Sequence, residues 1–332
     1  MLPLQLILDP SSLSLSSIGH THKDALGYIE EILAWDQLSS KSFGIAITSH
    51  DTWYSLSEDK QLPDFSSLQK RLHECNVQEH DANDVIQHIN NIIMRRPYLE
   101  DIEPTPQEDK IISLSKDMHV QGPNMHRVFS KIIQILKRRD STEKERVSII
   151  AQKIVKANKW SPESPSEKNT AGDESASVLL LLAGNYPDFL RHINIANLLS
   201  AHPFDEQELS MALQLTYDRY TGAITPSDEI PNYKIGDRFI KRVHFLNLTP
   251  EVIGKLMTIM VETLLEVNLR NAHNLREGKS GGTQPRTRKK AGSIAWRRDI
   301  DREHHLHYWK GDGGAVEFAW LSFPHDDFQC PE

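Results

Sequence analysis

Residues 295–314, AWRRDIDREHHLHYWKGDGG, contain the densest group of side chains in this chain that could move protons or hold phosphate. Imidazole titrates near neutral pH, so a histidine can serve as a general base or a general acid. Arginine grips a phosphate through two parallel N–H donors. His305 and His307 are two residues apart, so on a strand they share one face. Metal-free RNA cleavage needs a base, an acid and a cation, and these residue types supply all three.

The turn after this segment decides which side chains surround the histidines. A two-residue turn at 312–313 is favoured, because Asp-Gly suits a turn with positive φ at both positions. It pairs His307 with Phe318 and gives the histidines aromatic neighbours, in which case they can be ordinary cross-strand packing. A loop one residue longer places Glu317 on the histidine face instead. Only that register permits a His-His-carboxylate metal site, joined by His325 or Asp327.

The last ninety residues resemble the RelE/ParE superfamily of bacterial toxins. The resemblance rests on Trp296-Arg297-Arg298, the strand-like runs 306–310 and 316–323, and the tail His325-Asp326-Asp327. It implies a small α+β domain that cleaves mRNA without a metal in one branch and poisons gyrase by binding in the other. It implies that Arg297 or Arg298 holds the scissile phosphate and that His305, His307 or His325 exchanges protons. Pro324 and two acids stand where many relatives have an arginine or tyrosine, so the chain departs from the family pattern at a catalytic position.

A basic segment precedes and overlaps this region, although the whole chain has a net charge of −8. Residues 276–302 carry three acids and nine bases, which are Arg276, Lys279, Arg286, Arg288, Lys289, Lys290, Arg297, Arg298 and Arg302. Such a segment indicates either a polyanion-binding arm or a solvated loop. We expect nucleic acid, RNA rather than DNA, to contact Arg286, Arg288, Lys289 and Lys290. Trp309 is the aromatic candidate for stacking on a base, and packing in a core is its alternative role.

The N-terminal region offers a second, weaker candidate. Asp9 ends a predicted first strand at 2–9, and five further acids follow at Glu30, Glu31, Asp51, Asp81 and Asp84. Carboxylates that converge on a divalent cation are typical of PIN-like nucleases, which LILDPSS and DANDV faintly resemble. The local interpretation is a turn at Asp9, a helix start at Asp81 and a solvated helix face at Glu30.

The pattern of elements predicts an α+β or α/β multidomain protein. We expect an acidic α/β domain at 1–109, a mainly helical region at 110–235 with a flexible linker at 161–175, and a C-terminal α+β domain with an antiparallel meander at 236–332. Helices are predicted at 23–38, 63–75, 80–96, 127–139, 141–157, 176–186 and 205–220, and from 250 onward, with Thr249 as N-cap and Pro250 as the first helical residue. Strands are predicted at 238–248, 294–300, 304–310 and 315–323.

Composition limits the remaining possibilities. No run of eighteen apolar residues exists, so we expect no membrane span, and the N-terminus reads as a strand and not a signal peptide. Cys75 and Cys330 match no zinc or redox spacing, so we expect a reducing cytoplasm and neither cofactor nor metal. The leading hypothesis is a bacterial toxin or anti-phage effector that cleaves RNA with His and Arg chemistry. The alternatives are a non-catalytic adaptor that binds nucleic acid or protein, with an antitoxin among the possible partners, and a PIN-like metal nuclease.

Overall fold

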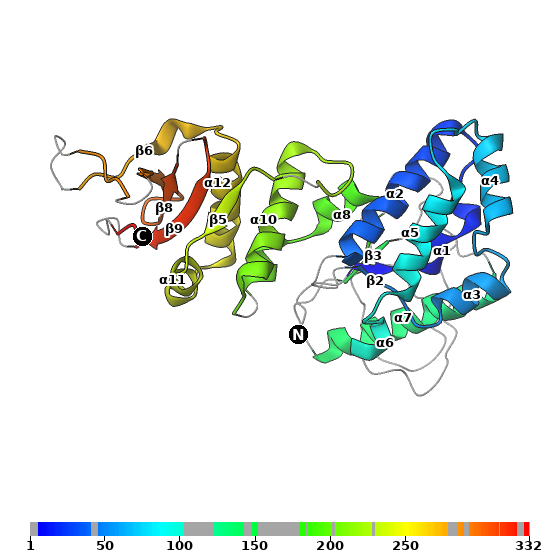
Figure 1. The fold of residues 1–332 in the computed structure, drawn as a ribbon. Helices are drawn as coiled ribbons and strands as arrows, with labels where there is room; N and C mark the ends of the chain where they lie inside the picture. Colours follow the sequence, from blue (N-terminus) through cyan, green and yellow to red (C-terminus); the bar gives the residue numbers. More distant parts are fainter. Residues whose placement is uncertain are drawn as a thin grey trace. The chain divides into compact units, whose positions relative to one another are not determined.

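The computed structural model divides the chain into two compact units, which are described separately (Figure 1). Unit 1 comprises Met1–Ile193 and Ile224–Pro226, and unit 2 comprises Asn194–Ala223 and Ser227–Glu332. The described residues are 6–40, 46–102, 122–142, 148–151, 180–183, 185–200, 203–227, 230–277, 284–288, 292–311, 313–323 and 329–331. Our division at residues 109 and 235 stays a prediction, and the predicted linker at 161–175 lies outside the described residues.

Unit 1 is built on a parallel four-stranded sheet in the order β2-β1-β3-β4. Its strands are β1 (Leu6–Leu8), β2 (Ala46–Ile47), β3 (Ser148–Ala151) and β4 (Leu180–Ala183). The accompanying helices are α1 (Pro10–Leu13), η1 (Leu15–Ser17), α2 (His22–Ser40), α3 (Thr52–Glu58), α4 (Phe65–Glu74), α5 (Ala82–Met94), α6 (Leu99–Ile102), α7 (Pro123–Thr142) and α8 (Tyr186–His192). Asp64 and Asp81 cap α4 and α5 through their side chains, so the helices predicted near 63–75 and 80–96 are confirmed.

Two predictions in the middle of the chain are wrong. We expected helices over the runs SIIA and LLLA, and these runs are the central strand β3 and its neighbour β4. A short, continuous apolar run fits a buried parallel strand as well as a buried helix, because periodicity does not separate the two.

Unit 2 contains a mixed five-stranded sheet in the order β5-β9-β8-β7-β6, with β5 parallel to β9 and the other pairs antiparallel. The strands are β5 (Tyr233–Ile235), β6 (Ala272–Asn274), β7 (Ile294–Asp299), β8 (His305–Lys310) and β9 (Val316–Ser322). The helices are α9 (Ile195–Ser200), α10 (Glu206–Thr221), α11 (Phe239–Leu246), α12 (Pro250–Leu264) and η2 (Leu269–Asn271). The predicted α+β class and the meander β7-β8-β9 are confirmed.

Two helices of unit 2 show how far local sequence determines structure. Thr249 caps α12 and Pro250 is its first residue, as predicted. The run at 238–248 was expected to be a strand, and it is the helix α11, which Asn247 ends in the left-handed region at φ 45°. Phe239 and Val243 are its buried residues and lie four apart, which is a helical spacing.

In the described part of the chain, none of the helices has the length and apolar character that crossing a bilayer requires.

Candidate functional site

Strand pairing in unit 2 brings Arg297, Asp299, His305 and His307 onto one face of the sheet. Arg297 lies opposite His307 and Asp299 lies opposite His305 across the antiparallel pair β7-β8. Directly opposite side chains share a face, and residues two apart on one strand do so as well. We call these four residues the imidazole face. The structure therefore places the predicted arginine and both predicted histidines together.

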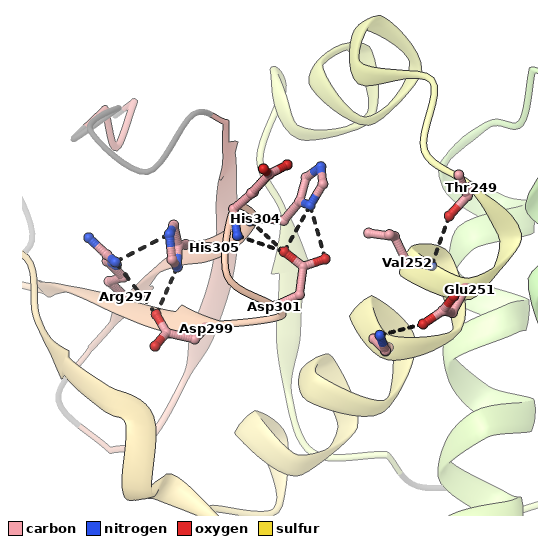
Figure 2. Close-up of polar contacts among 10 residues, drawn as sticks. Thr249, Glu251, Val252, Arg297, Asp299, Asp301, His304 and His305 are labelled. Carbon is pink, nitrogen blue, oxygen red and sulfur yellow. Dashed lines mark hydrogen bonds and ion pairs between the residues drawn. The ribbon is translucent and has the colours of Figure 1, made fainter.

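A chain of polar contacts connects three members of the imidazole face (Figure 2). Nδ1 of His305 lies 2.7 Å from Oδ1 of Asp299, and Nη2 of Arg297 lies 3.2 Å from Nε2 of His305. Arginine can only donate, so Nε2 of His305 must accept and carries no proton. The proton of the neutral ring then resides on Nδ1 and points at the carboxylate. This geometry holds the His305 ring as the neutral tautomer with its proton on Nδ1. Its unprotonated nitrogen, Nε2, already accepts a hydrogen bond from Arg297.

His307 and Trp309 are tied to the end of the chain. Nδ1 of His307 donates to the carbonyl of Gln329 at 2.5 Å, and Nε1 of Trp309 donates to the carbonyl of Pro331 at 2.8 Å. Between these two contacts, Cys330 packs in an apolar cluster that includes Trp309, and burial raises the pKa of its thiol to about 12. Residues 329–331 therefore lie against the same side of the sheet as the histidines. Trp309, 2% exposed, is a core residue and not an open stacking platform.

Burial makes the imidazole face an internal network. His305 is 1% exposed, His307 is 0% exposed and Arg297 is 6% exposed. A general base must reach the proton that it removes, and a phosphate-binding arginine must reach phosphate. In this conformation these side chains contact other protein groups instead. Asp299, which orients His305, was missed in the sequence, although its position two residues after Arg297 placed it on the same face.

The hairpin β8-β9 adopts the longer of the two registers that the sequence left open. Gly311 and Ala315 close the loop, with the N–H of Gly311 donating to the carbonyl of Ala315, and Trp309 lies opposite Glu317. The favoured pairing of His307 with Phe318 is wrong, because a bulge after His307 shifts its partner to Trp320. The Asp-Gly pair favours a two-residue turn. The chain instead forms a longer loop, because Gly313 and Gly314 both adopt positive φ, which glycine does without strain.

Glu317 thus shares the histidine face, but it is not a metal ligand there. Nη1 and Nη2 of Arg288 hold its two carboxylate oxygens at 2.7 and 2.6 Å. These hydrogen bonds hold the pKa of Glu317 below its usual range. The guanidinium of Arg288 also lies over the ring of Trp309, 4.9 Å from its centroid. Within the described residues, no group of three histidine, cysteine or acidic side chains could hold a metal ion.

Arg298 does not join the imidazole face, because it points to the opposite side of the sheet. Its guanidinium donates to Oε2 of Glu262 at 2.6 Å, to Oγ1 of Thr263 at 3.2 Å and to two backbone carbonyls that follow α12. It is 1% exposed. The expectation that Arg298 holds a scissile phosphate is therefore corrected: Arg298 joins β7 to α12. His325, Lys289 and Lys290, the remaining predicted site residues, lie outside the described residues.

The N-terminal acids do not converge in the described part of unit 1. Asp51 pairs with Lys131 at 2.7 Å, and Lys131 also pairs with Glu100 at 3.0 Å. The other acids are exposed or partly exposed on helices, or form a cap: Glu30, Glu31, Asp81 and Asp84. The carboxylate set of a metal nuclease is therefore not assembled among these residues.

Asp9 differs from the other N-terminal acids. It follows β1 where the strand order reverses, which is the position at which open parallel sheets bind ligands. Its Oδ2 accepts from the backbone N–H and the hydroxyl of Ser11, which makes Asp9 the N-cap of α1. Complete burial raises the pKa of Asp9 to about 7, although the hydrogen bonds from Ser11 lower it. Its local role is the N-cap of the short helix α1, where the sequence predicted a turn.

The Arg298–Glu262 pair generates a stability prediction. Arg298→Met leaves the buried Glu262 carboxylate without its cation, and we expect a loss of about 3–5 kcal/mol in the free energy of unfolding, measured by urea denaturation. The double variant Arg298→Met/Glu262→Met should recover much of that loss. Arg302→Met, at an exposed position, is the matched control and should change stability by less than about 0.5 kcal/mol. A loss below about 1 kcal/mol for Arg298→Met would contradict this role.

The raised pKa of Asp9 generates a pH prediction. Folded Asp9 keeps its proton up to about pH 7, whereas the unfolded chain releases it near its ordinary value of 3.8, so stability falls as pH rises between these values. Above pH 7 the buried charge costs on the order of 4 kcal/mol. Asp9→Asn should therefore stabilise the protein at pH 8 and much less at pH 5, in urea unfolding at both values. Equal effects at both values would refute the shift, and exposed Asp237→Asn is the control.

Neither a family model, nor a curated protein, nor a solved structure matches this chain. The resemblance of the last ninety residues to the RelE/ParE superfamily accordingly stays a prediction.

Proposed function

We propose that this protein binds RNA through unit 2 and does so without cleaving it at the imidazole face. The observation that carries the proposal is a row of exposed cationic and imidazole side chains along the outer strand of the sheet. We call this row the basic edge; it comprises Arg270, His273, Arg276 and the partly exposed Arg286. β6 is the last strand of the sheet on that side within the described residues, and Arg286 is brought to Arg276 by the pairing of Arg276 with Pro285.

The basic segment divides into an inner and an outer set. Arg288, Arg297 and Arg298 lie against the carboxylates of Glu317, Asp299 and Glu262, respectively. Their charge is balanced inside the unit. Arg276 and Arg286 belong to the outer set, and so does exposed Arg302. Phosphate contacts require cations that are exposed to solvent. When such cations neutralise phosphates, the counterions of the nucleic acid are released into solution, which favours binding.

The absence of turnover follows from the contacts of His305. A nitrogen that accepts from Arg297 cannot also take the proton of a ribose hydroxyl. The adaptor function, binding without catalysis, therefore agrees with the geometry better than metal-free ribonuclease chemistry does. The ribonuclease activity, the role in toxicity or phage defence and the protein partner stay predictions.

RNA binding is tested by salt dependence. Wild-type protein should bind a fluorescent 20-nucleotide RNA with an affinity that falls steeply as salt rises from 50 to 200 mM. Arg270→Gln/Arg276→Gln should weaken binding at low salt and reduce the slope of log affinity against log salt by about 1.4, because each single-strand phosphate contact contributes about 0.7. Lys255→Gln, which removes an exposed lysine on α12, is the control. A slope that the double variant leaves unchanged would refute the basic edge.

The second experiment concerns cleavage. Purified protein incubated with the same RNA in EDTA should leave it intact, because Nε2 of His305 accepts from Arg297 and both histidine side chains are buried. Gel electrophoresis over several hours is sufficient. RNA cleavage that disappears in the double variant His305→Ala/His307→Ala, while Asp301→Ala retains it, would show instead that the imidazole face is catalytic.

A further inference from the structure

The helix α11 presents a row of basic residues that ends in an exposed aromatic ring. Arg238, Lys241, Arg242 and Phe245 follow one another at intervals of three, one and three residues, which aligns them on one side of a helix. Phe239 and Val243 are buried and attach the opposite side to the unit, with the Phe239 ring 6.3 Å from that of Phe318 on β9. Phe245 is 76% exposed, the highest fraction among the exposed large apolar side chains of the described residues.

Arg242 fixes the position of this row against the sheet. β5 covers β9 only from Val316 to Phe318. Beyond Phe318, the side chain of Arg242 forms hydrogen bonds with the backbone at this margin. Its Nε donates to the carbonyl of Leu321 at 2.9 Å, and its Nη2 donates to the carbonyl of Phe323 at 3.0 Å. The guanidinium is thereby held at the margin of β9 by two hydrogen bonds, so its orientation is set before any ligand arrives.

Aromatic rings flank the anchored guanidinium. Cζ of Arg242 lies 4.7 Å from the ring centroid of Trp320 and 5.3 Å from that of Phe245. Phe323, 39% exposed, directly follows the end of β9 and stacks with His304 at a centroid separation of 4.9 Å and an interplanar angle of 20°. We call Arg238, Lys241, Arg242, Phe245, Trp320 and Phe323 the stacking surface. It combines one anchored cation, Arg242, and two exposed cations, Arg238 and Lys241, with aromatic rings that are exposed or partly exposed.

We infer that the stacking surface binds single-stranded nucleic acid. Proteins that bind single strands without strong sequence preference combine a cationic path for the phosphates with aromatic rings on which unpaired bases stack. Residues 234–245 carry four lysines and arginines against one acid, Asp237, so the charge of this segment suits a polyanion. A duplex keeps its base faces inside the stack and cannot use Phe245. The inference rests on the proposed function for RNA as the ligand, and it adds the preference for a single strand.

A peptide that adds a strand to β9 is a less suitable occupant. Strand addition needs free backbone groups along the margin of a sheet. The carbonyls of Leu321 and Phe323 already accept from Arg242. This margin therefore presents side chains to solvent, and these side chains are both cationic and aromatic.

The test is a set of fluorescence anisotropy titrations in EDTA with the full-length protein. The probes are a 12-nucleotide unstructured RNA, the duplex formed from it and its complement, and a DNA strand of the same sequence. Phe245→Ala should weaken single-strand binding about tenfold and leave duplex binding unchanged, because it removes a ring and no charge. Phe245→Trp should restore the affinity, whereas Phe245→Leu should not, which separates stacking from apolar contact. Tyr54→Ala, 58% exposed in unit 1, is the control for the loss of an exposed ring.

The outcomes separate this inference from the proposed function. Wild-type affinity for the single strand in Phe245→Ala, or an equal loss for single strand and duplex, would overturn the stacking surface and leave the basic edge in place. If wild-type protein binds none of the three probes, both proposals are overturned. If the DNA strand binds as tightly as the RNA and depends equally on Phe245, the stacking surface is supported and RNA as the preferred ligand is contradicted.

Discussion

The hydrogen bond from Arg297 to Nε2 of His305 is the constraint on which the interpretation of unit 2 depends. Because arginine only donates, Nε2 of His305 must be the unprotonated acceptor in this contact. The ring proton is then on Nδ1 and points at Asp299. Arg297 and His305, which separately indicate chemistry, form one internal network with Asp299 through this hydrogen bond. The same principle holds on the other side of the sheet, where Arg298 meets Glu262 and two backbone carbonyls. Buried polar groups of this kind need full sets of partners, and here they join β7 to β8 and to α12.

This arrangement moves the functional question from the interior of the sheet to its margins. The arginines nearest the histidines balance carboxylates, so they contribute to the folded state and not to a ligand. Positive charge remains accessible at both ends of the sheet, along η2 and β6 on one side and along α11 at the margin of β9 on the other. The second region combines this charge with the exposed ring of Phe245 and the partly exposed ring of Trp320, both within 5.3 Å of the Arg242 guanidinium. There, cations and surfaces for stacking lie side by side.

Local signals in the sequence predicted several parts of this structure. Thr249 and Pro250 marked the start of α12, and the strand-like runs 294–300, 304–310 and 315–323 marked β7, β8 and β9. The shared face of His305 and His307 followed from strand geometry. The sequence could not predict which residues of distant segments pair with each other. Glu262 precedes its partner Arg298 by thirty-six residues, and Glu317 follows its partner Arg288 by twenty-nine. Reading 238–248 as a strand hid the stacking surface, since Arg238, Lys241 and Phe245 share a side only on a helix.

The protonation of His305 is the measurement that tests this account most directly. Nitrogen-15 spectra of the protein labelled in its histidine rings, with His305 assigned by comparison with His305→Gln, report which ring nitrogen carries a proton. The account predicts a neutral ring at pH 7 with the proton on Nδ1 and none on Nε2. A proton on Nε2, or a doubly protonated ring, would contradict it, because Arg297 could then not donate to His305 and the histidine would be available for acid–base chemistry.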